Sequence, residues 1–86
     1  MIHLIYGEGF LRSIKHLPEK TAAKLTDLLT VLGNNPYHSL LHTKKLSGDL
    51  AGSFSFRITR DWRVIFQFID TRTIKLIRVK HRKDIY

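Results

Sequence analysis

The spacing of hydrophobic residues changes once along the chain, close to Gly52. Before that point apolar residues recur every three or four positions, which is typical of amphipathic helices. After it they recur at every second position, which is typical of half-buried strands. A short apolar stretch at residues 3–6 comes before the first helical pattern. The pattern therefore predicts one strand, two helices and then a run of strands.

The two helices are predicted at residues 8–17 and from Pro18 to residue 32. Proline suits the first turn of a helix, where its missing N–H has no helical partner. The segment Gly33-Asn34-Asn35-Pro36 is a strong stop signal for the second helix. The apolar stripes consist of Phe10, Leu11, Ile14 and Leu17 in the first helix and Ala22, Leu25, Leu28, Leu29 and Leu32 in the second.

Three strands are predicted after Gly52, at residues 53–59, 62–69 and 73–79, and their short connections favour an antiparallel meander. Residues 37–52 look irregular, apart from a short extended piece at 44–46. We therefore expect a single domain over residues 1–86 with an α+β fold in the order β-α-α-β-β-β. In this fold a helical hairpin packs on one face of a small, twisted, mainly antiparallel sheet.

The period of two also predicts which side chains share a face of this sheet. The residues expected to face the helices are Phe54, Phe56, Trp62, Val64 and Phe66. The residues expected on the opposite face are Ser55, Arg57, Arg63 and Gln67. Two arginines on one sheet surface would form a floor able to bind phosphate.

The positive charge is concentrated in the second half of the chain. The net charge is +8, and residues 1–43 hold four basic and three acidic side chains, whereas residues 44–86 hold eleven and four. This asymmetry indicates a polyanionic partner such as nucleic acid, or an acidic protein that neutralises the face. A solvated basic surface that only keeps the protein soluble is the alternative interpretation.

Composition excludes several other classes of protein. The chain has no cysteine, so it has no disulfide and no thiolate zinc site. No apolar run approaches the ~20 residues that span a bilayer. The first residues lack the basic and long apolar regions of a signal peptide. We expect a cytoplasmic protein with no metal, no cofactor and no membrane partner.

The residues that end the chain favour RNA chemistry. RNA is cleaved without metal when a base removes the ribose 2′-OH proton, cations stabilise the phosphorane and an acid protonates the leaving oxygen. The candidates for these roles are Arg57, Arg63, His81 and Tyr86. The cations expected to bind RNA around them are Lys44, Lys45, Arg60, Arg78, Lys80 and Arg82.

Each candidate also has a plain structural interpretation. The arginines could be cross-strand surface charges, His81 a surface imidazole, and Tyr86 an aromatic ring that only packs or stacks. The functional interpretation depends on one spatial expectation, which is that Arg57 and Arg63 converge with His81 around a single scissile phosphate.

Two segments, Lys45 to Phe66 and Ile77 to Tyr86, resemble the RelE/ParE toxin superfamily of bacterial toxin–antitoxin systems. The similarity covers essentially the whole chain and is carried by the pattern Leu-x-Gly-x-x-x-Gly-x-x-x-x-Arg-Ile-x-x-x-x-Arg-Val-Ile-Phe and a late His and terminal Tyr. Resemblance to the RelE and YoeB branch implies a ribosome-dependent mRNA interferase. Such a toxin cleaves mRNA in the ribosomal A site and is held inactive by a cognate antitoxin.

By position, the resemblance makes Arg57 and Arg63 the phosphate-binding arginines and makes His81 and Tyr86 the C-terminal catalytic pair. Two positions depart from the relatives. Lys44 stands near the place where YoeB has a glutamate base, and Ser55 stands where RelE has a lysine. We therefore expect His81 to be the general base. The alternative within the superfamily is a ParE-like toxin, which inhibits DNA gyrase and has no nuclease activity.

Overall fold

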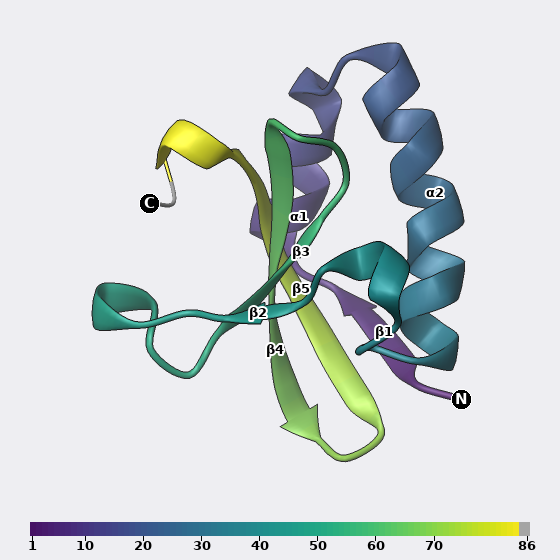
Figure 1. Cartoon of the computed structure of the whole chain (residues 1–86), viewed down its shortest axis with the longest axis vertical. Helices are drawn as coiled ribbons and strands as arrows, with labels where there is room; N and C mark the ends of the chain where they lie inside the picture. Colours follow the sequence, from purple (N-terminus) through teal and green to yellow (C-terminus); the bar gives the residue numbers. More distant parts are fainter. Residues whose placement is uncertain (85–86) are drawn as a thin grey trace.

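The computed structural model describes residues 1–84. Its two helices and five strands follow the predicted α+β order, with the short piece at 44–45 forming a strand of its own (Figure 1). The elements are β1 (His3–Tyr6), α1 (Glu8–Ser13), α2 (Glu19–Asn34), β2 (Lys44–Lys45), β3 (Phe54–Arg57), β4 (Trp62–Asp70) and β5 (Thr73–His81), with 3₁₀ turns at Ile14–His16, Ser39–Leu41, Gly48–Leu50 and Arg82–Asp84. Within residues 1–84 no helix is long and apolar enough to cross a bilayer.

The five strands form one mixed sheet in the order β1-β5-β4-β3-β2. Strand β1 runs parallel to β5, and the other neighbours are antiparallel, which confirms a mainly antiparallel sheet. The long hairpin of β4 and β5 forms its centre (Figure 1).

In the tight turn of this hairpin, Asp70 accepts a hydrogen bond from the backbone N–H of Arg72 at 2.8 Å. This bond is the main reason that the pKa of Asp70 is lowered from its ordinary value.

The core lies between α2 and the predicted face of the sheet. Helix α2 contributes Leu25, Leu28 and Leu32, and α1 contributes Phe10. The buried sheet residues of this core are Phe56, Val64, Phe66, Ile74, Leu76 and Val79, with Phe54 and Trp62 partly buried against them. The expected inner face of β3 and β4 is therefore confirmed. Burial of these side chains stabilises the fold by about 1.5–3 kcal/mol each.

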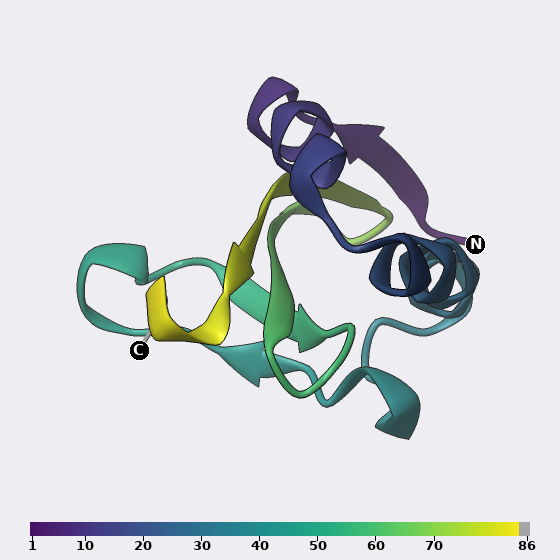
Figure 2. The same cartoon turned by 90° about the horizontal axis from the view of Figure 1, so that it is seen from above.

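Helix α1 lies along the edge of β5, which the sequence did not predict (Figure 2). Strand β1 pairs with β5 only as far as Leu76, and the backbone N–H of Gly7 then donates to the Leu76 carbonyl at 2.9 Å. Further along, the Ser13 hydroxyl accepts the Val79 N–H at 2.9 Å. The helix thus covers and partly satisfies a sheet edge that would otherwise be open to pairing.

This close approach requires glycine at the start of α1. A Cβ atom at Gly7 would lie 2.6 Å from the Leu76 carbonyl oxygen, and one at Gly9 would lie 2.8 Å from the Ile77 carbonyl oxygen. Both neighbours are backbone atoms of a central hairpin, so they cannot move aside without disturbing the sheet. Neither glycine adopts a positive φ, so backbone conformation does not require glycine at these positions. Glycine is required because any side chain would be too close to the β5 backbone.

We expect Gly7→Ala to lower the free energy of unfolding by about 1–3 kcal/mol, because the added methyl group overpacks against backbone. Chemical denaturation followed by circular dichroism measures this loss. Gly33→Ala is the matched control, since a Cβ there meets its nearest atom, the Ile2 carbonyl oxygen, at 3.8 Å inside a helix. That control should be neutral or more stable by about 0.5–1 kcal/mol. Equal stabilities for the two variants would contradict the close-approach argument.

Candidate nucleic-acid interface

A row of three cations crosses the outer face of the sheet. Arg57 of β3 is paired with Arg63 of β4, and Arg63 is paired with Lys80 of β5. Neighbouring strands lie about 4.8 Å apart, so the three side chains leave the sheet side by side. Like charges directly opposite one another destabilise a sheet. An anion bound across this row would relieve that repulsion. We call Arg57, Arg63 and Lys80 the cationic row.

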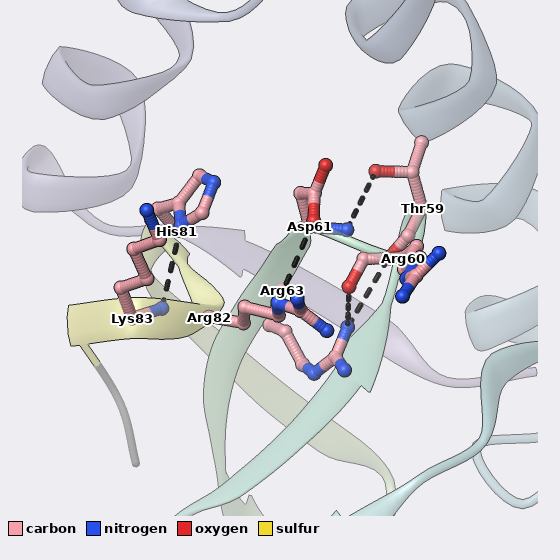
Figure 3. Close-up of polar contacts among 7 residues, drawn as sticks. All are labelled: Thr59, Arg60, Asp61, Arg63, His81, Arg82 and Lys83. Carbon is pink, nitrogen blue, oxygen red and sulfur yellow. Dashed lines mark hydrogen bonds and ion pairs between the residues drawn. The ribbon is translucent and has the colours of Figure 1, made fainter.

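The guanidinium of Arg63 is held in place by the turn between β3 and β4. Its Nη1 donates to the backbone carbonyl of Thr59 at 3.1 Å and to that of Arg60 at 3.3 Å (Figure 3). A guanidinium carries five N–H donors in a fixed plane, and this orientation suits it to a phosphate or carboxylate. The side chain is only partly buried. Arg63 is thus a pre-oriented cation at the centre of the row.

The C-terminal turn is tied to the same loop. The backbone N–H of Arg82 donates to the Asp61 carbonyl at 2.8 Å. The side-chain Nε of Arg82 lies 3.5 Å from the Asp61 carboxylate (Figure 3). Both side chains are about half exposed, so the ion pair itself adds little stability. Its effect is positional, because it fixes residues 82–84 beside the turn that orients Arg63.

His81 does not share a face with the arginines. It is paired with Trp62, and its imidazole packs edge-on against the indole with ring centroids 5.2 Å apart. Figure 3 shows the imidazole pointing toward the helices while the Arg63 guanidinium points away from them. The expected convergence of Arg57, Arg63 and His81 on one side of the sheet is therefore wrong. His81 stands at the end of β5, one residue past Lys80.

A β-bulge is the physical reason for this placement. Leu76 pairs with Phe66 and Arg78 pairs with Ile65, so Ile77 is an extra residue in β5. An unbroken alternation would have put His81 on the face of the arginines, but one extra residue reverses the faces of all that follow. The strand also continues two residues beyond the predicted end at Val79, because Trp62 provides a partner for His81.

The hydrogen bond of the imidazole further limits its chemistry. Nδ1 of His81 accepts the backbone N–H of Lys83 at 3.3 Å, so in this arrangement the proton of the neutral ring is on Nε2. The ring can then donate a hydrogen bond from Nε2. It can accept a proton at Nδ1 only after the contact with Lys83 opens. Tyr86, the other expected catalytic residue, lies outside the described residues.

The remaining predicted cations are spread around the row. Lys44 is paired with Ser55 and lies on the arginine face, whereas Lys45 is paired with Phe54 on the opposite face. Arg60 is exposed in the β3–β4 turn, where it and Arg57 border a groove of about 490 Å³ against α2. Only some of the cations that were predicted to bind RNA therefore lie on the same face of the sheet as Arg57 and Arg63.

Arg78 is not part of the cationic row and lies against α1, where the sequence had not placed a site. Its Nη2 and Nε atoms are 3.7 and 3.9 Å from the position that a Cβ of Gly9 would take. Arg78 and Lys80 line a groove of about 330 Å³ together with Arg12 and His16. Sequence reasoning missed these two α1-side residues. Their spacing of four, on the polar side of the helical pattern, was the available signal.

The arrangement is suited to binding phosphate and stabilising negative charge. Among residues 1–84, no group of three His, Cys, Asp or Glu side chains is placed to hold a metal ion. Arginine forks supply electrostatic stabilisation of a phosphorane directly. The geometry therefore supports charge stabilisation at the row.

Comparison with known proteins gives a consistent result. Residues 4–86 match the family model described as the ParE toxin of the type II toxin–antitoxin system parDE. No curated protein matches the sequence. The fold is similar to YafQ from E. coli strain BL21(DE3), with a TM-score of 0.80 and 19% identity over 100% of this chain and 99% of that chain.

Two further similar structures come from toxin–antitoxin complexes. One is RelBE2 from Mycobacterium tuberculosis, with a TM-score of 0.77 and 25% identity over 94% of this chain and 98% of that chain. The other is YoeB–YefM from Staphylococcus aureus, with a TM-score of 0.73 and 21% identity over 93% and 95% of the two chains. Both of these proteins were crystallised together with an antitoxin.

Proposed function

The chain belongs to the ParE toxin family of type II toxin–antitoxin systems, within the RelE/ParE superfamily, and from this premise we propose that it is an mRNA endoribonuclease that acts in the ribosomal A site. The observation that carries the proposal is the cationic row, with Arg63 pre-oriented at its centre. A protein that inhibits an enzyme only by contact has no need for arginines at directly paired positions of neighbouring strands. A nuclease has that need, because charge develops on the phosphate in its transition state.

The proposed reaction is attack of a ribose 2′-OH on the adjacent phosphate. Arg57 and Arg63 bind the non-bridging oxygens, and Lys80 adds positive field. The 2′ oxygen forms a bond to phosphorus as the bond to the 5′ oxygen breaks. The products are a 2′,3′-cyclic phosphate and a 5′-hydroxyl end. The 2′-OH proton is taken up by a base, and the leaving oxygen receives a proton from an acid.

We assign proton transfer to the end of β5. His81 acts on a substrate that passes around this end from the cationic row, since it faces the other side of the sheet. We propose Tyr86 as its catalytic partner on the resemblance to the superfamily alone. With Nδ1 bonded to Lys83, the imidazole donates from Nε2 to the substrate. Its action as the general base requires that bond to open. We therefore propose that the arginines contribute more to the rate than His81 does.

The proposed partners follow from the same assignment. The RelBE2 and YoeB–YefM structures are complexes with antitoxins. We propose that a cognate antitoxin neutralises this chain in the cytoplasm by covering the basic surface that includes the cationic row. The functional RNA partner is mRNA positioned by the ribosome and its rRNA. No metal or cofactor takes part in the proposed reaction.

Gyrase inhibition is the second candidate, because the matching family model is that of the ParE toxin. Brief induction of the chain separates the two functions. We expect protein synthesis to stop first, with new 5′-hydroxyl ends mapped inside the codons of a reporter message. The control is the same strain carrying a non-inducible copy. DNA damage that appears before any loss of translation, with intact mRNA, would favour gyrase inhibition instead.

A further inference from the structure

A groove between α1 and β5 has no part in the proposed reaction, apart from Lys80 at its border with the cationic row. It lies where the first helix runs along the β5 edge and has a volume of about 330 Å³. Its lining residues are Gly9, Arg12, Ser13, His16, Arg78, Val79 and Lys80. Three of these are permanent cations and one is a histidine. None of the described residues that line this groove is acidic.

The cations of the groove are not neutralised by the rest of the described chain. Within residues 1–84, the side chains of Arg12, His16 and Arg78 take part in no ion pair or hydrogen bond. The acidic residue Glu8 borders an adjoining depression together with Arg12 and Arg78 but forms no ion pair with either. Unpaired like charges around one concave space repel each other. A bound anion would remove that repulsion.

The groove is also built on rigid backbone. Gly9 brings α1 within packing distance of Ile77, and its missing side chain leaves the space against which the Arg78 guanidinium lies. Ser13 holds the other end of the helix to β5 through the Val79 N–H. Both walls are therefore fixed before any ligand binds, which lowers the entropy that binding must overcome.

The lining chemistry identifies the class of ligand. Arginine forks bind phosphate oxygens through parallel N–H···O contacts, and an imidazole can add a further donor. The groove is small and exposed to solvent at its rim, since Arg12, His16 and Arg78 are all exposed. This suits one phosphate group rather than a planar base, because none of the described residues that line the groove has an aromatic ring able to stack on one, apart from the imidazole of His16.

We propose that the α1–β5 groove is a phosphate-binding site, separate from the cationic row and joined to it through Lys80. Lys80 lies in the row beside Arg63 and also lines the groove, so a continuous basic path runs around the sheet edge. The phosphate belongs to a nucleic-acid backbone that follows this path or is a free anion. The site does not depend on whether the chain cleaves RNA or inhibits gyrase.

Titration of the full ¹⁵N-labelled chain tests this proposal. The two probes are inorganic phosphate and a short 2′-O-methyl RNA, which has no free 2′-OH and so is not cleaved. We expect the amides of Gly9 and Ser13 and the Nε of Arg78 to shift with both probes. The double substitution Arg12→Gln with His16→Gln should weaken binding of each about tenfold.

The control pair is Lys15→Gln with Lys20→Gln, which removes two charges from the same region but none that lines the groove. It should change RNA affinity much less than the groove variant. Glu8→Gln should strengthen binding, because it removes a carboxylate that borders the adjoining depression. All five of these side chains are exposed, so each variant should fold, which thermal unfolding checks.

Each outcome of the two titrations supports or overturns the proposed site. Shifts with both probes that are lost in the groove variant support a site for backbone phosphate. Shifts with inorganic phosphate alone support a site for a free anion. No groove shifts with either probe, or equal weakening by the groove and control variants, would overturn the proposal. A nuclease-inactive chain that still binds at the groove would refute the proposed function while leaving this site intact.

Discussion

Arg63→Ala is expected to lower the rate of mRNA cleavage by about 10²- to 10³-fold, the effect of removing one pre-oriented donor from a developing anion. Arg63 is the central member of the cationic row, and two carbonyls of the β3–β4 turn fix its guanidinium. Single-turnover cleavage of a reporter message on programmed ribosomes measures the rate. Rescue of growth after induction gives the corresponding result in cells.

Arg63→Lys separates charge from shape. A lysine keeps the positive charge but loses the planar fork, so its rate should lie between those of the wild type and the alanine variant. Arg72→Ala is the matched control, because it removes one exposed arginine in the turn at the far end of the hairpin. If Arg63→Ala and Arg72→Ala cleave equally well, the row is not the site of phosphate chemistry.

The order of the elements and the inner face of the sheet could be predicted from the sequence. Phe56, Val64 and Phe66 repeat at a period of two, and only one assignment of faces buries all of them. The same alternation correctly placed Arg57 and Arg63 together on the outer face. Local patterns decide these features, so no long-range information was needed.

The position of His81 could not be obtained by assuming one unbroken strand. The sequence does contain a signal, because apolar residues at 74 and 76 are followed by apolar residues at 77 and 79. This change of phase marks the bulge at Ile77 and the reversal of faces after it. The signal is short and becomes clear only when β4 provides the register.

The packing of α1 along the edge of β5 could not be predicted from the sequence for a different reason. Helical spacing predicts which face of α1 is apolar, but it does not predict which strand the helix will lie beside. That arrangement depends on the parallel pairing of β1 with β5, a contact between the two ends of the chain. Gly7 and Gly9 have ordinary backbone angles, so their role appears only when Leu76 and Ile77 are in place.

Removal of residues 81–86 is expected to abolish growth arrest while the domain stays folded. Among residues 1–84, every buried core side chain precedes the cut, because the last of them is Val79. The truncation removes the bond from the Arg82 N–H to Asp61, the Arg82–Asp61 ion pair and the packing of His81 on Trp62. Together these interactions contribute about 1–3 kcal/mol. Growth after induction and thermal unfolding of the purified chain measure the two effects.

Point variants decide which of the removed residues matters. His81→Gln keeps a polar side chain at the end of β5 but cannot exchange a proton, so a large loss of cleavage there supports proton transfer by the imidazole. Arg82→Gln removes the exposed ion pair and one expected RNA-binding cation but keeps the backbone bond to Asp61, so it should lower cleavage much less than His81→Gln does. If the truncated chain still stops growth, the end of β5 has no catalytic role. In that case the cationic row would account for the toxic activity without it.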